Sequence, residues 1–90
     1  MTTDVSLERV RQVVAEEGRL AVGVDRLGDD DDLYLAGMTS HACVDVMLTI
    51  EEAFDMEFPQ ATLHKDTFRS IAAIHRAVSL LVASDEPLAS

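Results

Sequence analysis

The chain has 90 residues, of which 17 are Asp or Glu and 7 are Lys or Arg, so its formal net charge at pH 7 is −10. This charge disfavours a nucleic-acid ligand, because phosphate backbones are held mainly by Lys and Arg. A chain this short rarely encloses a deep active site, which favours a binding or carrying role over an enzyme. Partners with basic surfaces are expected instead.

The composition changes too little along the chain to mark a linker. We therefore expect residues 1–90 to form a single domain, with flexible ends at about 1–3 and 84–90. No apolar run approaches the ~20 residues that cross a bilayer, and residues 1–10 contain no apolar run preceded by positive charge, so neither a membrane span nor an export signal is expected. Cys43 is the one cysteine and suits a reduced, buried residue, so a cytoplasmic location is expected.

The first predicted helix covers about Asp4 to Glu17, where apolar residues recur at three- and four-residue steps between charges. Asp4 or Thr3 could cap this helix, and Gly18 could end it. Residues 19–39 have no sustained period but are rich in apolar side chains, so we expect a long, ordered loop packed over the helices. The apolar residues of this loop are Leu20, Val22, Val24, Leu27, Leu33, Tyr34, Leu35 and Met38.

Four consecutive carboxylates, Asp29 to Asp32, lie within this loop. Calcium ligands usually come from alternating positions with a glycine among them, and the run lacks that spacing, so solvation or long-range steering is the preferred interpretation. The histidines, His41, His64 and His75, form no zinc-ligand spacing. His41 beside Ser40 could suggest a nucleophile and its base, but neighbours on a helix point about 100° apart and no third group orients them. Neither a metal site nor a catalytic site is predicted.

Ser40 lies where a polar, glycine-containing stretch gives way to a helical pattern that runs from Ala42 to Phe54. A serine in this place either caps the helix by accepting a backbone N–H or offers a hydroxyl for modification. Thr39 could cap the helix equally well. The wide apolar face of the helix is expected to be buried. This face contains Cys43, Val46, Met47, Ile50, Ala53 and Phe54.

The opposite face of the same helix carries two apolar residues, Val44 and Leu48, inside an acidic border. The arrangement is typical of a small docking face, although single exposed apolar residues are also common on protein surfaces. The border consists of Asp45, Glu51 and Glu52, with His41 at its upper end.

Pro59 stops the helical pattern, and Phe58 is expected to return to the core. A short helical turn is predicted around Leu63 to Asp66, and Thr67 or Asp66 could cap a last helix. The fold class is therefore all-α, a bundle of three main helices and one short helix with a long ordered loop between the first two. The apolar stripe of the last helix consists of Phe68, Ile71, Ala72, Ile74, Ala77, Val78, Leu80 and Leu81.

The block from Gly37 to Pro59 resembles the acyl carrier protein family, which includes aminoacyl and peptidyl carriers. The family pattern is a Leu-Gly-x-Asp-Ser-Leu loop, a helix that reads Val-Glu-Leu, and an ending in Glu-Glu-x-Phe and Ile-Pro. The similarity in layout extends over nearly the whole chain. The corresponding residues, without a gap, are Ala36-Gly37-Met38-Thr39-Ser40-His41, Val44-Asp45-Val46, Ile50-Glu51-Glu52-Ala53-Phe54 and Phe58-Pro59.

The resemblance implies a monomeric four-helix carrier whose Ser40 receives 4′-phosphopantetheine from coenzyme A, through a phosphopantetheinyl transferase. The thiol of this arm would hold an acyl or aminoacyl group as a thioester. A loading ligase or acyltransferase would supply that group, and further enzymes with basic docking surfaces would take it. The positive end of the helix dipole would favour the attached phosphate. The docking residues implied are Thr39, His41, Val44, Asp45, Leu48, Glu51 and Glu52.

Two positions depart from the family pattern, because Thr39 replaces its Asp and His41 replaces its Leu. The changes remove a negative charge and an apolar contact beside Ser40. They predict either weaker recognition by a general-purpose transferase or the need for a dedicated one, and they favour a specialised partner. An aminoacyl carrier loaded by a stand-alone ligase is the preferred subtype, while the cargo is set by the partner enzymes and not by the fold. The alternative is an unmodified interaction module that binds a partner through the second helix. A metal-binding protein built on Asp29 to Asp32 is a third hypothesis.

Overall fold

The computed structural model describes residues 6–21 and 23–84. Within these ranges there is no strand, and the predicted all-α class is confirmed. Residues 1–3 and 85–90, which belong to the ends expected to be flexible, lie outside the described residues, as does Val22 of the predicted loop. The elements are α1 (Leu7–Glu17), η1 (Val24–Arg26), α2 (Ser40–Phe54), η2 (Gln60–Thr62), η3 (Lys65–Phe68) and α3 (Ile71–Ser84), where η marks a short 3-10 helix.

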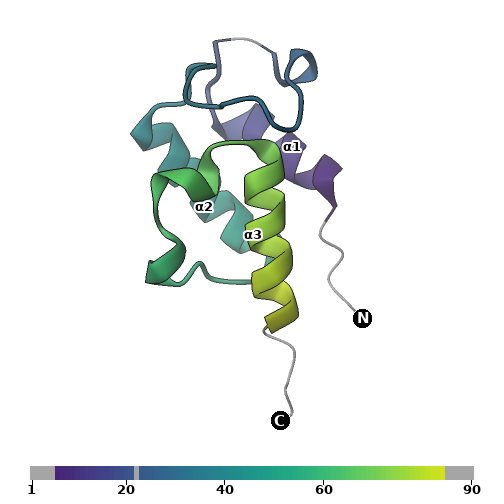
Figure 1. Cartoon of the computed structure of the whole chain (residues 1–90), viewed down its shortest axis with the longest axis vertical. Helices are drawn as coiled ribbons and strands as arrows, with labels where there is room; N and C mark the ends of the chain where they lie inside the picture. Colours follow the sequence, from purple (N-terminus) through teal and green to yellow (C-terminus); the bar gives the residue numbers. More distant parts are fainter. Residues whose placement is uncertain (1–5, 22, 85–90) are drawn as a thin grey trace.

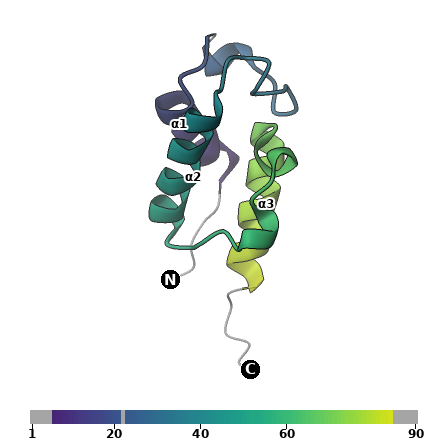
Figure 2. The same cartoon turned by 90° about the vertical axis from the view of Figure 1, so that its left-hand side faces the viewer.

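The three α-helices form a bundle in which α1 packs against both α2 and α3. Residues 18–39 cross one end of this bundle (Figure 1). After α2, the chain returns past α3 to the same end, so that α2 and α3 both begin beneath the loop (Figure 2). The core is mostly aliphatic, and it also contains Phe54, Phe58, which returns to the core as predicted, and Phe68. Its largest fully buried side chains are Leu33, Ile50, Ile71, Ile74, Val10, Val13, Val14, Val46 and Val78.

The helix α1 begins later than its predicted start near Asp4. Ser6 is its N-cap, because the Ser6 hydroxyl accepts a hydrogen bond from the Arg9 N–H at 3.0 Å. The predicted caps, Thr3 and Asp4, lie outside the described residues. Gly18 ends the helix as predicted, and its N–H donates to the Val14 carbonyl.

The loop of residues 19–39 is ordered and packs on the helices, as its apolar content predicts. Leu33 and Met38 are buried, and Tyr34 is partly buried. The prediction is wrong for Leu35, which is 88% exposed. Asp32 causes this difference, because its side chain accepts the Leu35 N–H and holds a tight turn that directs Leu35 outward.

Both predicted caps of the last helix are wrong. Its first turn is held by Ser70, whose hydroxyl accepts from the Ala73 N–H at 3.0 Å, while Thr67 and Phe68 belong to η3. The predicted single turn around residues 63–66 is replaced by two 3-10 helices, η2 and η3.

Hydrogen bonds between distant backbone groups join the loop to the start of α3. The Leu33 N–H donates to the Arg69 carbonyl at 2.7 Å, and the Ala72 N–H donates to the Asp29 carbonyl at 2.8 Å.

The buried face of α2 is shifted relative to its prediction. Ala42 is fully buried, whereas Cys43 and Met47 are half-buried and Ala53 is exposed. The reason is that α2 is covered by α1 on one side and faces an open groove, described below, on the other. In α3, Leu80 is 63% exposed, because at about 100° per residue it lies on the opposite side of the helix from the fully buried Ile74 and Val78.

Candidate functional site

Ser40 and Thr39 have different roles at the start of α2. Thr39 is the N-cap, and its Oγ1 accepts a hydrogen bond from the Ala42 N–H at 3.1 Å. Ser40 is the first helical residue and is exposed, and its hydroxyl has no hydrogen-bond partner among the residues that the structure describes. This hydroxyl lies at the positive end of the helix dipole, where an attached anion is favoured. The serine is therefore free for modification without loss of the cap.

The backbone just before α2 is fixed by a close approach at Gly37. This residue has a φ of +114°, and a Cβ there would lie 2.9 Å from the Ala21 backbone nitrogen. The Ala21 N–H donates to the Ala36 carbonyl at 2.8 Å, which ties the start of the loop to its end. Only glycine fits this conformation without strain. Gly37 thus sets the position from which α2, and Ser40, begin.

A groove of about 650 Å³ opens beside Ser40, between the first half of α2 and the segment that leads into η3. Its volume lies within the ~300–1,000 Å³ typical of small-molecule sites. The lining is largely apolar with a few polar groups, and none of its described residues is acidic. The lining residues are Tyr34, Met38, Thr39, Ser40, Cys43, Val44, Met47, Leu63, His64, Lys65 and Phe68.

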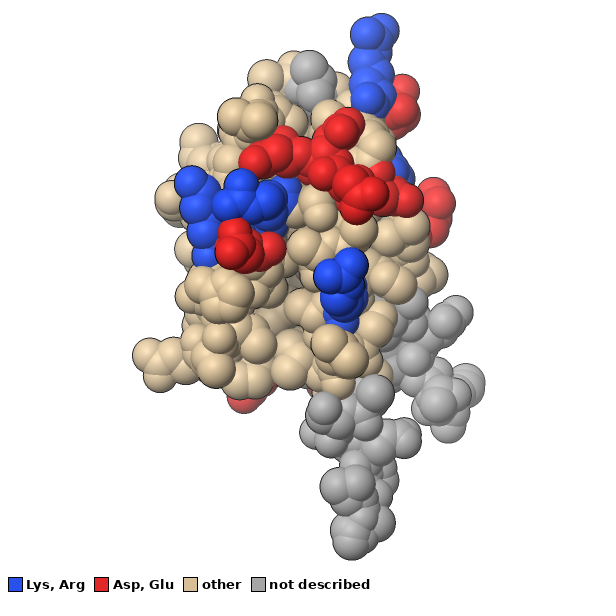
Figure 3. All heavy atoms as spheres, in the orientation of Figure 1, with Lys and Arg blue, Asp and Glu red and all other residues tan. Residues whose placement is uncertain are grey.

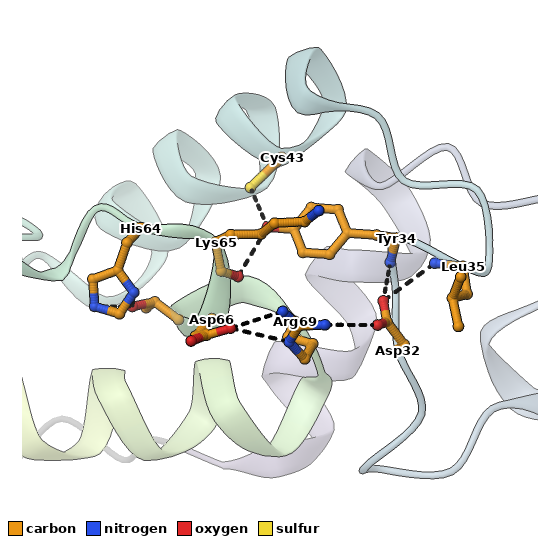
Figure 4. A network of polar contacts seen from close by, with 9 residues as sticks. Asp32, Tyr34, Leu35, Cys43, His64, Lys65, Asp66 and Arg69 are labelled. Atoms are coloured by element: carbon orange, nitrogen blue, oxygen red, sulfur yellow. Dashed lines mark hydrogen bonds and ion pairs between the residues drawn. The ribbon is translucent and has the colours of Figure 1, made fainter.

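Tyr34 joins the two walls of this groove (Figure 4). Its hydroxyl donates to the Lys65 carbonyl at 3.1 Å and lies 3.7 Å from the Cys43 sulfur. Burial raises the pKa of Tyr34, and the hydrogen bond with Cys43 raises it further. Burial also raises the pKa of Cys43, against the opposite effect of its bond with Tyr34. Both groups therefore remain protonated at neutral pH and form an uncharged wall.

Arg69 anchors the same region through two carboxylates (Figure 4). Its guanidinium pairs with Asp66 at 2.8 Å and with Asp32 at 3.0 Å. The hydrogen bond from Arg69 lowers the pKa of Asp66. Desolvation raises the pKa of Asp32, but hydrogen bonds from the Leu35 and Tyr34 N–H groups and from Arg69 outweigh it, so the pKa is lowered overall. The network fixes Tyr34 in the loop against η3.

Acidic side chains gather across the loop end of the molecule, with basic side chains beside them (Figure 3). Of the predicted acidic run, Asp29 pairs with Arg11, Asp32 pairs with Arg69, and Asp31 accepts the Gly28 N–H. Within residues 6–21 and 23–84, no group of three or more His, Cys, Asp or Glu residues is placed to hold a metal ion. The run therefore has identifiable structural partners within the fold.

The predicted docking residues fall into two groups. Val44 and Leu48 are 47% and 52% exposed, and His41 and Glu52 are also exposed. In contrast, Asp45 pairs with Arg19 at 3.2 Å, and a Glu51 carboxylate oxygen accepts the Phe58 N–H at 2.9 Å. A second groove, of about 970 Å³, begins at Leu48 and continues past the end of α2. It is lined by Leu48, Glu51, Glu52, Asp55, Met56, Glu57, Pro59 and Leu81.

Four of the groove residues that come from outside α2 are not predicted as site residues from the sequence, namely Tyr34, Leu63, His64 and Lys65. Tyr34, Leu63 and His64 lie outside the helices and Lys65 begins the short helix η3, so none of them belongs to a long periodic stretch. Their meeting depends on contacts between distant parts of the chain. One signal was available, since Tyr34 is the single tyrosine and Lys65 the single lysine of the chain.

An exposed serine at the start of a helix, beside an open groove in a small acidic bundle, defines a carrier protein. Residues 8–77 match the family model described as a phosphopantetheine attachment site. The chain belongs to the acyl carrier protein family, as its sequence predicts. It is 46% identical over 77 residues to the aminoacyl carrier protein of Agrobacterium fabrum, a match that covers 86% of this chain and 93% of that relative.

Solved structures of carrier proteins are also similar to this chain. A carrier protein from Agrobacterium tumefaciens, in complex with an engineered Bradyrhizobium japonicum glycine:carrier protein ligase and AMP, is 44% identical, with a TM-score of 0.80 over 82% of this chain and 99% of that one. A second match is a glycylated carrier protein in complex with Bradyrhizobium japonicum glycine:carrier protein ligase. It is 27% identical, with a TM-score of 0.70 over 82% of this chain and 99% of that one. No described helix of the present chain is both long enough and apolar enough to span a membrane.

Proposed function

We propose that Ser40 is the attachment point of 4′-phosphopantetheine and that the protein carries an amino acid on this arm. When bound, the arm supplies a thiol that holds its cargo as a thioester. The observation that carries the proposal is the exposed Ser40 hydroxyl, which has no partner among the described residues because Thr39 caps the helix instead. A transferase can therefore modify Ser40 without breaking a structural hydrogen bond.

The surroundings of Ser40 fit this group in size and chemistry. The apolar side chains of the groove beside it would hold the dimethyl part of the arm, and Tyr34 and His64 in the same lining would offer groups to its amides. The first turn of α2 presents backbone N–H groups to the phosphate. The absence of acidic side chains among the described groove residues removes a direct source of repulsion.

An amino acid, with glycine as the first candidate, is the cargo that the relatives favour. The A. fabrum relative is an aminoacyl carrier protein, and similar carriers are seen in complexes with a glycine:carrier protein ligase. A ligase of this kind is the proposed loading enzyme, and a phosphopantetheinyl transferase that accepts Thr39 and His41 beside the serine is the proposed modifying enzyme. A cytoplasmic location belongs to the same proposal and rests on the lone cysteine.

The docking surface that we propose for both enzymes is the exposed side of α2. Val44 and Leu48 provide its apolar contacts, and His41 and Glu52 provide exposed polar groups. Asp45 and Glu51 add negative charge while each also holds an internal contact. Basic partner surfaces complement this side.

Intact-protein mass spectrometry tests the proposal directly. Incubation with coenzyme A and a broad-specificity phosphopantetheinyl transferase should add the mass of one phosphopantetheine group. ATP, glycine and the B. japonicum ligase should then add one glycyl group. Ser40→Ala should abolish both additions, whereas Ser79→Ala on α3 should leave both intact.

The opposite result favours the alternative hypothesis of an unmodified interaction module. If protein from its native host and protein treated with a transferase both lack the adduct, the carrier proposal is overturned. Partner binding that survives Ser40→Ala but is lost in Leu48→Asp would then identify α2 as a docking helix without an arm.

A further inference from the structure

Lys65, the only lysine of this acidic chain, lies beside the groove that contains Ser40. It lies at the start of η3, its side chain is exposed, and its Nζ lies 5.1 Å from the centroid of the Tyr34 ring (Figure 4). Both residues line the groove that contains Ser40. Lys65 is the one Lys or Arg among the described lining residues, and no described carboxylate forms an ion pair with its ammonium.

The contact of Lys65 with Tyr34 holds the ammonium at the groove without neutralising it. The Lys65 side chain is exposed, and an exposed cation is bound only weakly by an aromatic ring, so the ammonium can leave the Tyr34 ring at little cost. Four flexible methylene groups allow the ammonium to reach a phosphate as a point charge. The Tyr34 hydroxyl meanwhile holds the Lys65 carbonyl, which keeps the backbone of Lys65 beside the groove while its side chain moves.

A phosphodiester on Ser40 needs such a partner. The formal net charge of the chain is already −10, so an added anion meets a negative field. The start of α2 opposes this field through its backbone N–H groups, and its first turn contains no Asp or Glu and no Lys or Arg. The Cys43 sulfur, three residues after Ser40 in α2, lies 3.7 Å from the Tyr34 hydroxyl, so the residue that Lys65 covers reaches the first part of α2, and all four residues line one groove.

We propose that Lys65 is a binding residue for the phosphodiester linked to Ser40, and that it holds the first part of the arm along the groove between partner encounters. The inference rests on the proposed attachment at Ser40. It gives the arm two states, one held at the groove and one released toward an enzyme. The ligand of Lys65 is thus a phosphate monoanion within the same chain.

Nuclear magnetic resonance of the protein before and after phosphopantetheine attachment tests this inference. In the wild type, attachment should shift the backbone amide resonances of Cys43, Leu63 and Lys65. In Lys65→Met, which keeps the length of the side chain but removes its charge, the shifts at Cys43 and Leu63 should fall about threefold, as the loss of one exposed charge pair implies. Lys65→Arg should retain most of the effect. Arg76→Met, which removes an exposed charge on α3 outside the groove, is the matched control and should match the wild type.

Salt and mass measurements complete the test. About 1 M sodium chloride should reduce the shifts in the wild type but not those that remain in Lys65→Met, because salt screens exposed charge pairs. Equal shifts in the wild type and in Lys65→Met, with the adduct present in both by mass spectrometry, would overturn the role of Lys65 alone. A wild type that never acquires the adduct would overturn the attachment at Ser40 as well.

Discussion

At the scale of single residues, the site depends on two neighbouring hydroxyls with different tasks. Because Thr39 supplies the helix cap, Ser40 can be exposed and unbonded. Thr39→Ala should lower the free energy of unfolding by about 1 kcal/mol, the usual cost of losing an N-cap. Thr39→Asp should keep the stability of the wild type, because Asp also caps well and favours the positive helix end.

Urea denaturation monitored by circular dichroism measures these changes. Ser40→Ala is the matched control and should change the stability by less than about 0.5 kcal/mol, because its hydroxyl makes no bond among the described residues. A large loss in Ser40→Ala with none in Thr39→Ala would show that the serine, and not the threonine, is the cap.

A second residue-scale prediction concerns the pH dependence of Asp32. The pKa of this carboxyl is lowered below its ordinary value of 3.8, because hydrogen bonds from backbone N–H groups and Arg69 outweigh desolvation. Its contribution to stability is therefore complete above about pH 4 and is lost as the pH falls through the lower value of the folded state. Asp32→Asn should be less stable than the wild type at pH 7, and the difference should vanish in acid. Urea midpoints between pH 7 and about pH 2.5 measure it, and a difference independent of pH would contradict the prediction.

The sequence predicts single residues well where a local pattern determines them. Ser40 and Thr39 are both recognisable as candidate caps, because capping depends only on the first turn. Which of them caps is decided by the backbone before α2, where Gly37 has a positive φ against Ala21. Contacts of this kind join residues far apart in the chain and leave no local pattern to recognise.

At the scale of elements, the glycine before α2 is the most sensitive position. Gly37→Ala should lower the free energy of unfolding by about 1–3 kcal/mol, since it combines a left-handed conformation with a close contact to the Ala21 backbone. Attachment of phosphopantetheine should also slow, because the start of α2 must move. Gly28→Ala is the control, as its added Cβ would meet only the Asp31 side chain at 3.7 Å, and it should change the stability by less than about 0.5 kcal/mol. Equal losses in both variants would contradict this account.

The same distinction between local and distant information explains which elements could be predicted. The three α-helices follow from apolar residues at helical spacing, and each contributes a long periodic stretch. The 3-10 helices η2 and η3 and the packed loop have no such period. Their form depends on backbone pairs such as Leu33 with Arg69 and Ala72 with Asp29, which bring the loop to the start of α3.

At the scale of the whole molecule, ion pairs with arginine are distributed unevenly among the acidic residues. At the loop end, Asp29 and Asp32 each pair with an arginine. At the other end of α2, Glu52, Asp55 and Glu57 line the second groove, and no described Lys or Arg forms an ion pair with them. The negative end of the α2 dipole adds to their field. A basic partner should therefore be attracted most strongly to this end of the helix.

This uneven pairing predicts how the proposed loading by a ligase depends on salt. With the B. japonicum ligase and glycine, kcat/KM should fall as sodium chloride rises, because screening weakens long-range steering. The double variant Glu52→Gln and Asp55→Asn should lower kcat/KM about three- to tenfold at low salt and lose most of the salt dependence, as expected for two exposed charge pairs. Asn keeps the left-handed conformation of residue 55, where φ is 51°, so the fold should be retained. Glu8→Gln with Glu16→Gln removes the same charge from the exposed side of α1 and should have little effect. If both double variants slow loading equally, total charge governs the encounter, and the carboxylates at the end of α2 have no special part in it.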